Sequence, residues 1–252
     1  MRTIICLFSF ILCHQLAISQ SSAPEIIPTK NGEIKIYPVL HATMAIKYED
    51  QTIYADPYGG KKGFEGISDP SLILITDIHG DHMNLETLNE IGAQATPILA
   101  PQAVVEKLTP AFTNLTALAN GEKTTIQNVT IEAIPMYNLP EDSTSRHPKG
   151  RGNGYVLTID GKRIYISGDT EDISEMRNLE NIDIAFVCMN QPYTMTVEAA
   201  ADAVMEFKPK VVYPFHYRGK GGFSDVETFK RLINVGSDEI EVRLVNWYPE
   251  QE

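Results

Sequence analysis

The spacing of apolar residues predicts strands through the first third of the chain, and strands alternating with helices after it. The stretch 71–76, SLILIT, is almost entirely apolar, so we expect a strand that is buried on both faces. The other expected strands show alternation or short apolar runs, and they cover residues 33–40, 42–48, 51–55, 97–100, 129–136, 155–159, 163–167, 182–189, 211–216 and 239–246.

Helical spacing of apolar residues recurs between these strands, over residues 85–92, 102–108, 173–179, 197–207 and 225–235. The sequence Ser224-Asp225-Val226-Glu227 predicts a capping box for the last helix. Asp160-Gly161 predicts a tight hairpin between two strands. Residues 138–151 carry Pro, Ser, Gly and charges with little pattern, which is typical of a functional loop. With no repeat and no linker in view, we expect one domain.

The N-terminus is expected to be a signal peptide, residues 1–19, followed by a single domain over residues 20–252. One positive charge precedes a short apolar run, and Ala17-Ile18-Ser19 offers small residues for cleavage. The run is shorter than the ~20 residues that span a bilayer, which weighs against a membrane anchor. We therefore predict an exported protein, periplasmic or secreted, with no membrane attachment after cleavage. A lipoprotein attached through Cys13 is the remaining alternative.

Charge and cysteine content narrow the possible partners. The 252 residues include 21 Lys and Arg against 33 Asp and Glu, for a net charge of −12. Nucleic-acid binders concentrate positive charge on one face, so we expect no nucleic-acid partner. The predicted mature chain keeps only Cys188, so no internal disulfide is expected. The oligomeric state is left open.

Candidate metal ligands crowd the segment after the apolar strand 71–76. Asp77, His79, Asp81 and His82 fall in the sequence T-D-I-H-G-D-H. Carboxylates and imidazoles are the ligands that Zn, Mn and Fe prefer, and such a cluster without a cation would leave charge in a poorly solvated place. A solvated polar turn is the alternative interpretation.

Three further candidates lie at the ends of predicted strands or in adjacent loops, where α/β folds build their sites. His147 is in the loop before residue 155, Asp169 follows an apolar strand within Gly168-Asp169-Thr170, and His216 ends the run 211–216. The sequence thus predicts one metal centre built from distant segments.

Together these motifs resemble the metallo-β-lactamase-fold hydrolases, and more closely the branch that contains ascorbate-phosphate lactonase and related metal-dependent hydrolases. The family pattern is H-x-H-x-D-H, a separate His, a Gly-Asp-Thr and a final His. The segments LHATMAIKYEDQTIYADP (40–57) and HPKGRGNGYVLTIDGKRIYISGDT (147–170) are also similar to that branch, and the resemblance covers nearly all of residues 34–248. It implies an α+β fold, a four-layer αββα sandwich with metals at the sheet edges.

The resemblance also implies roles for residues and a pair of divalent metal ions, Zn most of all, with Mn or Fe as alternatives. Asp77, His79 and His147 would hold the first ion, Asp81, His82 and His216 the second, and Asp169 would bridge them; Asp81, His82 and Asp169 are the expected catalytic residues. Asp56 would orient a ligand His, His41 would lie near the site, and Asn190, Tyr193, Tyr217, Arg218, Lys149 and Arg151 would line the cleft.

Asp77 departs from the family pattern, which usually has His there. An oxygen ligand favours harder ions such as Mn or Fe. Because Asp is shorter than His, the sequence leaves open whether Asp77 reaches an ion. The implied activity is hydrolysis of a small ester, lactone or phosphodiester by a metal-bound hydroxide. The alternatives are a metal- or ligand-binding protein without turnover, and a β-lactam hydrolase, which the Gly168-Asp169-Thr170 motif disfavours.

Overall fold

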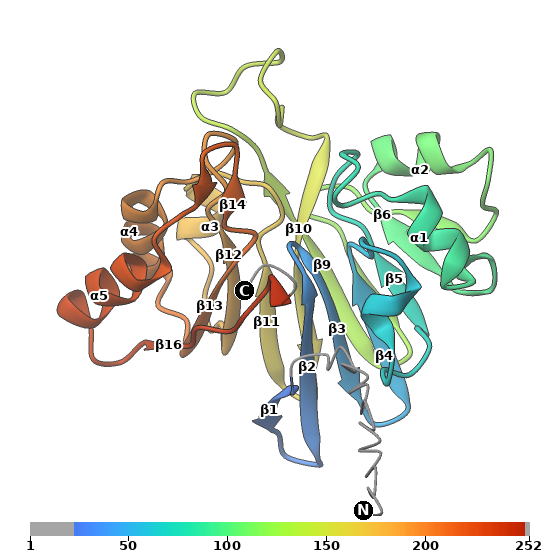
Figure 1. The fold of residues 1–252 in the computed structure, drawn as a ribbon, viewed down its shortest axis with the longest axis horizontal. Helices are drawn as coiled ribbons and strands as arrows, with labels where there is room; N and C mark the ends of the chain where they lie inside the picture. The colour runs from blue at the N-terminus through green and yellow to red at the C-terminus, as the bar shows by residue number, and fades with distance from the viewer. Residues whose placement is uncertain (1–22, 250–252) are drawn as a thin grey trace, which may run out of the picture.

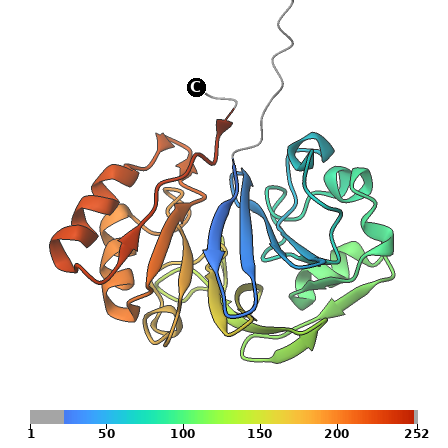
Figure 2. The same ribbon diagram turned by 90° about the horizontal axis from the view of Figure 1, so that it is seen from below.

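The computed structural model describes residues 23–249, so the predicted signal peptide lies outside the described residues. Two seven-stranded sheets pack face to face, and helices cover the outer face of each (Figures 1 and 2). This arrangement confirms the predicted four-layer αββα sandwich. Within residues 23–249, every helix is too short or too polar to cross a bilayer.

The first sheet holds the N-terminal half of the described chain. Its strands are β1 (Glu25–Pro28), β2 (Glu33–Leu40), β3 (Thr43–Tyr48), β4 (Gln51–Ala55), β5 (Leu72–Leu74), β6 (Ile98–Ala100) and β7 (Leu115–Ala117), in that order. Pairing is antiparallel from β1 to β4 and parallel from β4 to β7. Helices α1 (Leu85–Glu90) and α2 (Gln102–Leu108) lie on its outer side, with 3-10 turns at Lys61–Phe64 and Ala93–Ala95 (Figure 1).

The second sheet holds the C-terminal half. Its order is β16 (Glu241–Val242), β13 (Val211–Phe215), β12 (Ile184–Cys188), β11 (Lys162–Ile166), β10 (Gly152–Ile159), β9 (Val129–Met136) and β8 (Lys123–Ile126). Strands β8 to β11 are antiparallel, and β11, β12, β13 and β16 are parallel. Helices α3 (Ser174–Arg177), α4 (Val197–Phe207) and α5 (Val226–Gly236) cover it, and β14 (Arg218–Gly219) pairs with β15 (Gly222–Phe223) as a separate ribbon.

The apolar strand β5 is buried on both faces, as its sequence predicts. Leu72 and Leu74 pack into the core between the two sheets. Ile73 and Ile75 point the other way, into the core beneath the first sheet's helices. Because successive side chains in a strand point to opposite faces, only an unbroken apolar run can fill both layers.

The predicted hairpin is confirmed, whereas the predicted capping box is wrong. Asp160 and Gly161 both adopt positive φ, 45° and 79°, as a tight two-residue hairpin requires. Helix α5 is capped by Asp225, whose Oδ1 accepts from the Thr228 backbone N–H at 2.9 Å. Ser224 instead donates its hydroxyl to the Met189 carbonyl. Because the Ser224 hydroxyl binds a residue far away in the sequence, it does not cap the helix.

Several boundaries differ from the predictions. The expected strand 239–246 is paired only over Glu241–Val242, and the helix expected at 173–179 covers Ser174–Arg177. Strand β10 begins at Gly152, before the expected residue 155. Strands β1, β7 and β8 were not predicted, because they are short and lie at or near sheet edges, where pairing substitutes for an apolar pattern.

Strand direction brings the candidate ligands to one edge of the sandwich. Strand β2 runs the same way as β4 and β5, so the β2–β3 turn and the segments after β4 and β5 share an edge. In the second sheet, the segments after β11 and β13 and the segment before β10 share an edge for the same reason. The long segment between β9 and β10 rises above this end of the molecule (Figure 1).

Candidate metal centre

The structure brings all seven predicted metal ligands together at this edge. They form three groups, and the ligand atoms of each group lie within 4.8 Å of one another: Asp77, His79 and His147 (the first cluster), His82, Asp169 and His216 (the second cluster), and Asp81 with His41 and His216. His216 belongs to the last two groups. His41, which was expected near the site, therefore belongs to it.

The second cluster is the more deeply buried. The Nε2 atom of His216 lies 3.0 Å from Asp169 Oδ1 and 3.2 Å from His82 Nε2. His82 Nε2 lies 3.4 Å from Asp169 Oδ2. All three side chains are buried. Two imidazole nitrogens and a carboxylate thus converge on one point, which is the donor set of a zinc-type site.

Asp56 orients His82 for this cluster. Asp56 Oδ2 accepts from His82 Nδ1 at 2.8 Å, and the carboxylate also accepts from the Thr76 backbone N–H at 2.7 Å and hydroxyl at 2.6 Å. With its proton on Nδ1, the ring presents the Nε2 lone pair to the centre. Such carboxylate–histidine pairs fix the tautomer of metal-binding imidazoles.

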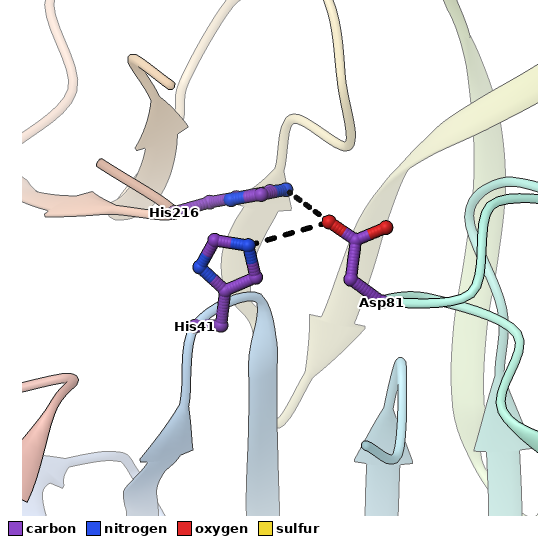
Figure 3. Close-up of side chains that lie close together, drawn as sticks. All are labelled: His41, Asp81 and His216. Carbon is purple, nitrogen blue, oxygen red and sulfur yellow. Dashed lines mark ion pairs between the residues drawn. The ribbon is translucent and has the colours of Figure 1, made fainter. Parts of the chain in front are cut away.

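His41 holds Asp81 in a similar way. Figure 3 shows His41 and His216 both directed at the Asp81 carboxylate, whose Oδ2 lies 3.3 Å from His41 Nε2 and 3.6 Å from His216 Nε2. Burial lowers the pKa of His41 to about 4, so the ring is neutral at pH 7. Tyr248 Oη accepts from the Arg218 backbone N–H, and its own proton is free for His41 Nδ1 at 2.7 Å. That tautomer leaves Nε2–H to donate to Asp81.

The first cluster joins the second through Asp169. Asp169 Oδ2 lies 3.1 Å from His147 Nε2, while its other oxygen faces His216. Asp77 Oδ2 lies 2.5 Å from His79 Nδ1. Asp77 is fully buried and also contacts the Arg151 guanidinium. Asp169 thus has the position of a bridging ligand.

Electrostatics support a cation at this edge. Burial opposes ionisation of Asp81 and Asp169, yet the surrounding imidazoles hold the pKa of each carboxyl well below its usual range. Among the described residues, Nδ1 of His147 and Nδ1 of His216 are buried without a hydrogen-bond partner. His147 Nε2 and Asp169 Oδ1 are also buried, and their ion-pair contacts with Asp169 Oδ2 and His216 Nε2 lack hydrogen-bond geometry. Buried polar atoms of this kind are costly unless a ligand satisfies them. The residues present therefore fit divalent metal ions.

Unusual backbone geometry marks the same place. His41, Asp56 and His216 adopt positive φ, at 61°, 46° and 45°. Gly168 also has a positive φ, 61°, and a Cβ there would lie 2.7 Å from Met136 Sδ. Positive φ is uncommon for residues other than glycine and clusters at functional sites. The fold thus holds these side chains in orientations that relaxed strands would not give.

Of the residues expected to line the cleft, Asn190 contacts a predicted metal ligand, whereas Tyr193 and Lys149 have other partners. Asn190 is buried and its Nδ2 lies 3.3 Å from His216 Nε2. Tyr193 packs under the Arg146 guanidinium, at 4.4 Å from the ring centroid. Lys149 pairs with Glu141 and Glu175, away from the metal ligands.

An aromatic group beside His41 was only partly predicted. Tyr217 and the Arg218 guanidinium both contact the Tyr248 ring, and Phe223, which is exposed, packs on Tyr217 and Tyr248. Tyr217 and Arg218 were candidates, whereas Tyr248 and Phe223 were missed. No local pattern indicates Tyr248, because it lies 207 positions from His41 in the sequence and meets it only in the folded structure.

Comparison with known proteins identifies relatives that are metal-dependent hydrolases. The family model of the β-lactamase superfamily domain matches residues 35–216. A UPF0173 metal-dependent hydrolase of Pyrococcus abyssi is 31% identical over 176 residues, which are 67% of this chain and 76% of the relative.

Two solved structures share the fold. A candidate metal-dependent hydrolase from Parabacteroides distasonis superposes with a TM-score of 0.78 at 37% identity, over 88% of this chain and 97% of the other. The metallo hydrolase Igni18 from Ignicoccus hospitalis has a TM-score of 0.72 at 22% identity, over 84% and 95% of the two chains, and shows the fold alone. The chain thus belongs to the β-lactamase superfamily, as a metal-dependent hydrolase with the metallo-β-lactamase fold.

Proposed function

We propose that this protein hydrolyses a small ester, lactone or phosphodiester with divalent ions held at the two clusters, Zn²⁺ before Mn²⁺ or Fe²⁺. The observation that carries the proposal is the convergence of His82, Asp169 and His216, with Asp56 fixing the lone pair of His82. An ion bound there would acidify water and polarise the bond to be cleaved.

The chain's own residues have separable tasks in this proposal. Asp81 and His79 are the ligands that solvent reaches, with side chains 32% and 23% exposed, so substrate would approach past them. Asp81, held by His41, is placed to accept a proton from attacking water. Asn190, beside His216, can donate a hydrogen bond to a developing oxyanion.

Metal reconstitution and a substrate panel test the proposal. Metal-free protein would be loaded with Zn²⁺, Mn²⁺ or Fe²⁺ and assayed on lactones, phosphodiesters, carboxylic esters and a β-lactam. We expect metal-dependent turnover of one of the first three classes. We also expect His82→Ala and Asp169→Ala to abolish it, since each removes a central ligand.

Cys188→Ser is the matched control. Burial raises the pKa of the Cys188 thiol to about 12, so it supplies no nucleophile and its replacement should leave activity intact. Full activity in either ligand variant would refute the proposed site. Metal binding without turnover on the whole panel would favour a binding protein, and turnover of the β-lactam alone would favour a β-lactam hydrolase.

We also propose that the protein is exported and acts on a small molecule in the periplasm or outside the cell. The leader-like sequence of residues 1–19 supports export. Mass spectrometry of the protein from a producing cell should find a chain that begins near residue 20, and an intact N-terminus would contradict export.

A further inference from the structure

Arg151 forms a two-point ion pair with a predicted metal ligand. Its Nε lies 3.2 Å from Asp77 Oδ1 and its Nη2 lies 3.1 Å from Asp77 Oδ2, so each carboxylate oxygen receives one N–H. Asp77 is fully buried, and the Arg151 side chain is 19% exposed. A paired guanidinium and carboxylate in this geometry form one of the stronger side-chain contacts in proteins.

The fold itself puts these two residues side by side. The Asn153 backbone N–H donates to the Thr76 carbonyl at 2.9 Å, which ties the start of β10 to the chain just after β5. Gly152 allows this approach, because a Cβ there would lie 2.9 Å from the same carbonyl oxygen. The contact between the sheets therefore sets Arg151 beside Asp77 independently of any metal.

The pair changes what the first cluster can offer an ion. Arg151 engages both oxygens of Asp77, and His79 Nδ1 also lies against Oδ2, so an ion must share or displace these partners. An imidazole in place of Asp77, the usual family ligand, would not attract a guanidinium. In the second cluster, by contrast, the ion pairs of the carboxylate of Asp169 among the described residues are all with histidines, His82, His147 and His216.

Local charge leads to the same conclusion. Asp77 is the carboxylate of the first cluster, and the guanidinium of Arg151 already neutralises it. A divalent ion bound there would add two positive charges beside that buried ion pair. Uncompensated buried charge of either sign is costly.

We propose that Arg151 makes the two metal sites unequal. The more tightly bound ion occupies the second cluster. Binding at the first cluster is weaker because Arg151 holds Asp77. Arg151 is thus a positioning residue that sets the affinity of the weaker ion, the one at the first cluster. This inference rests on the metal dependence of the proposed function, but not on its substrate or on turnover.

Calorimetric titration of metal-free protein with Zn²⁺, together with Co²⁺ absorption spectra, provides the test. We expect two binding steps in the unchanged protein, with dissociation constants at least about tenfold apart. Arg151→Met keeps an unbranched apolar stem and removes the guanidinium with its charge. It should tighten the weaker step by about 10- to 100-fold, because the ion would no longer compete with a hydrogen-bonded charged pair, and it should leave the tighter step unchanged.

Arg177→Met is the matched control. The Arg177 side chain is 20% exposed and pairs with Asp172, Asp202 and Glu206, which are not metal ligands. Its loss removes a comparable ion-pair network and should change neither step. An equal tightening in this variant would overturn the assignment to Arg151.

A double variant tests whether the gain depends on Asp77, and the two steps of the unchanged protein test the inference even if Arg151→Met alters the fold. With Arg151→Met and Asp77→Asn combined, the gain at the first cluster should vanish, since the freed carboxylate is gone, while the tighter step persists. Two steps of equal affinity in the unchanged protein, or an unchanged weaker step in folded Arg151→Met, would overturn the proposal. Because both readouts count ions, failure to find a substrate leaves this test intact.

Discussion

Replacing Asp56 by Asn should disable the second cluster without touching a metal ligand. Asp56 is buried and accepts three hydrogen bonds, from the backbone and hydroxyl of Thr76 and from Nδ1 of His82. An Asn side chain has nearly the same shape but replaces one acceptor oxygen with an NH₂ group. That group would face a donor, and the His82 ring would relieve the clash by moving its proton to Nε2, the atom directed at the metal.

The structure sets the expected size of both effects. Loss of the partner that orients a ligand imidazole typically costs 10- to 100-fold in metal affinity, or about 1.4–2.7 kcal/mol. One buried donor left without an acceptor costs about 1–3 kcal/mol of folding free energy. For a chain of this size, that loss lowers the melting temperature of the metal-free protein by about 2–12 °C.

A Zn²⁺ titration against a competing chelator would measure the affinity, and thermal unfolding would measure the stability. Asp183→Asn is the matched control. Asp183 is also buried and accepts from the Arg163 backbone N–H at 2.9 Å and from Lys210 Nζ at 2.8 Å, but it precedes β12 and so lies at the opposite edge of the sheet. It should lose stability and keep its metal affinity. Unchanged affinity in folded Asp56→Asn would refute the role given to Asp56.

Three further predictions concern other parts of the molecule. Tyr248→Phe should weaken metal binding at Asp81 and His216 by up to about tenfold in the same titration, since His41, which orients Asp81, loses the donor that sets its tautomer. Gly168→Ala should cost about 1–3 kcal/mol in denaturant unfolding, whereas Gly161→Ala, which has a similar φ but open space around its Cβ, should cost less. Although burial opposes it, Lys210 and the Arg163 N–H lower the pKa of Asp183, so the stability from this carboxylate is present above about pH 4 and is lost as the pH falls through the lowered pKa. The unfolding free energies of the original protein and Asp183→Asn should therefore differ by about 1–2 kcal/mol at pH 7 and converge under acid conditions; a constant difference would contradict this.

Much of the fold follows from local pattern. The unbroken apolar run of β5 could only belong to a strand with cores on both sides, and Asp160-Gly161 could turn tightly because both residues accept positive φ. Strands β1, β7 and β8 lacked such a signal, since edge pairing rather than side-chain burial holds them in place. The cap of α5 was misjudged because Ser224 found a distant carbonyl, which no window of neighbouring residues contains.

The candidate site divides in the same way. The closely spaced acids and imidazoles after β5 predict a cation site from the sequence alone, because so many charged groups close together need a compensating charge. The sequence does not reveal which residues hydrogen-bond to each ligand. The contact of Arg151 with Asp77 depends on the packing of the two sheets against each other. Tyr248 contacts His41 although the two are 207 positions apart in the sequence. Such pairings arise from three-dimensional packing, and a linear pattern carries no record of them.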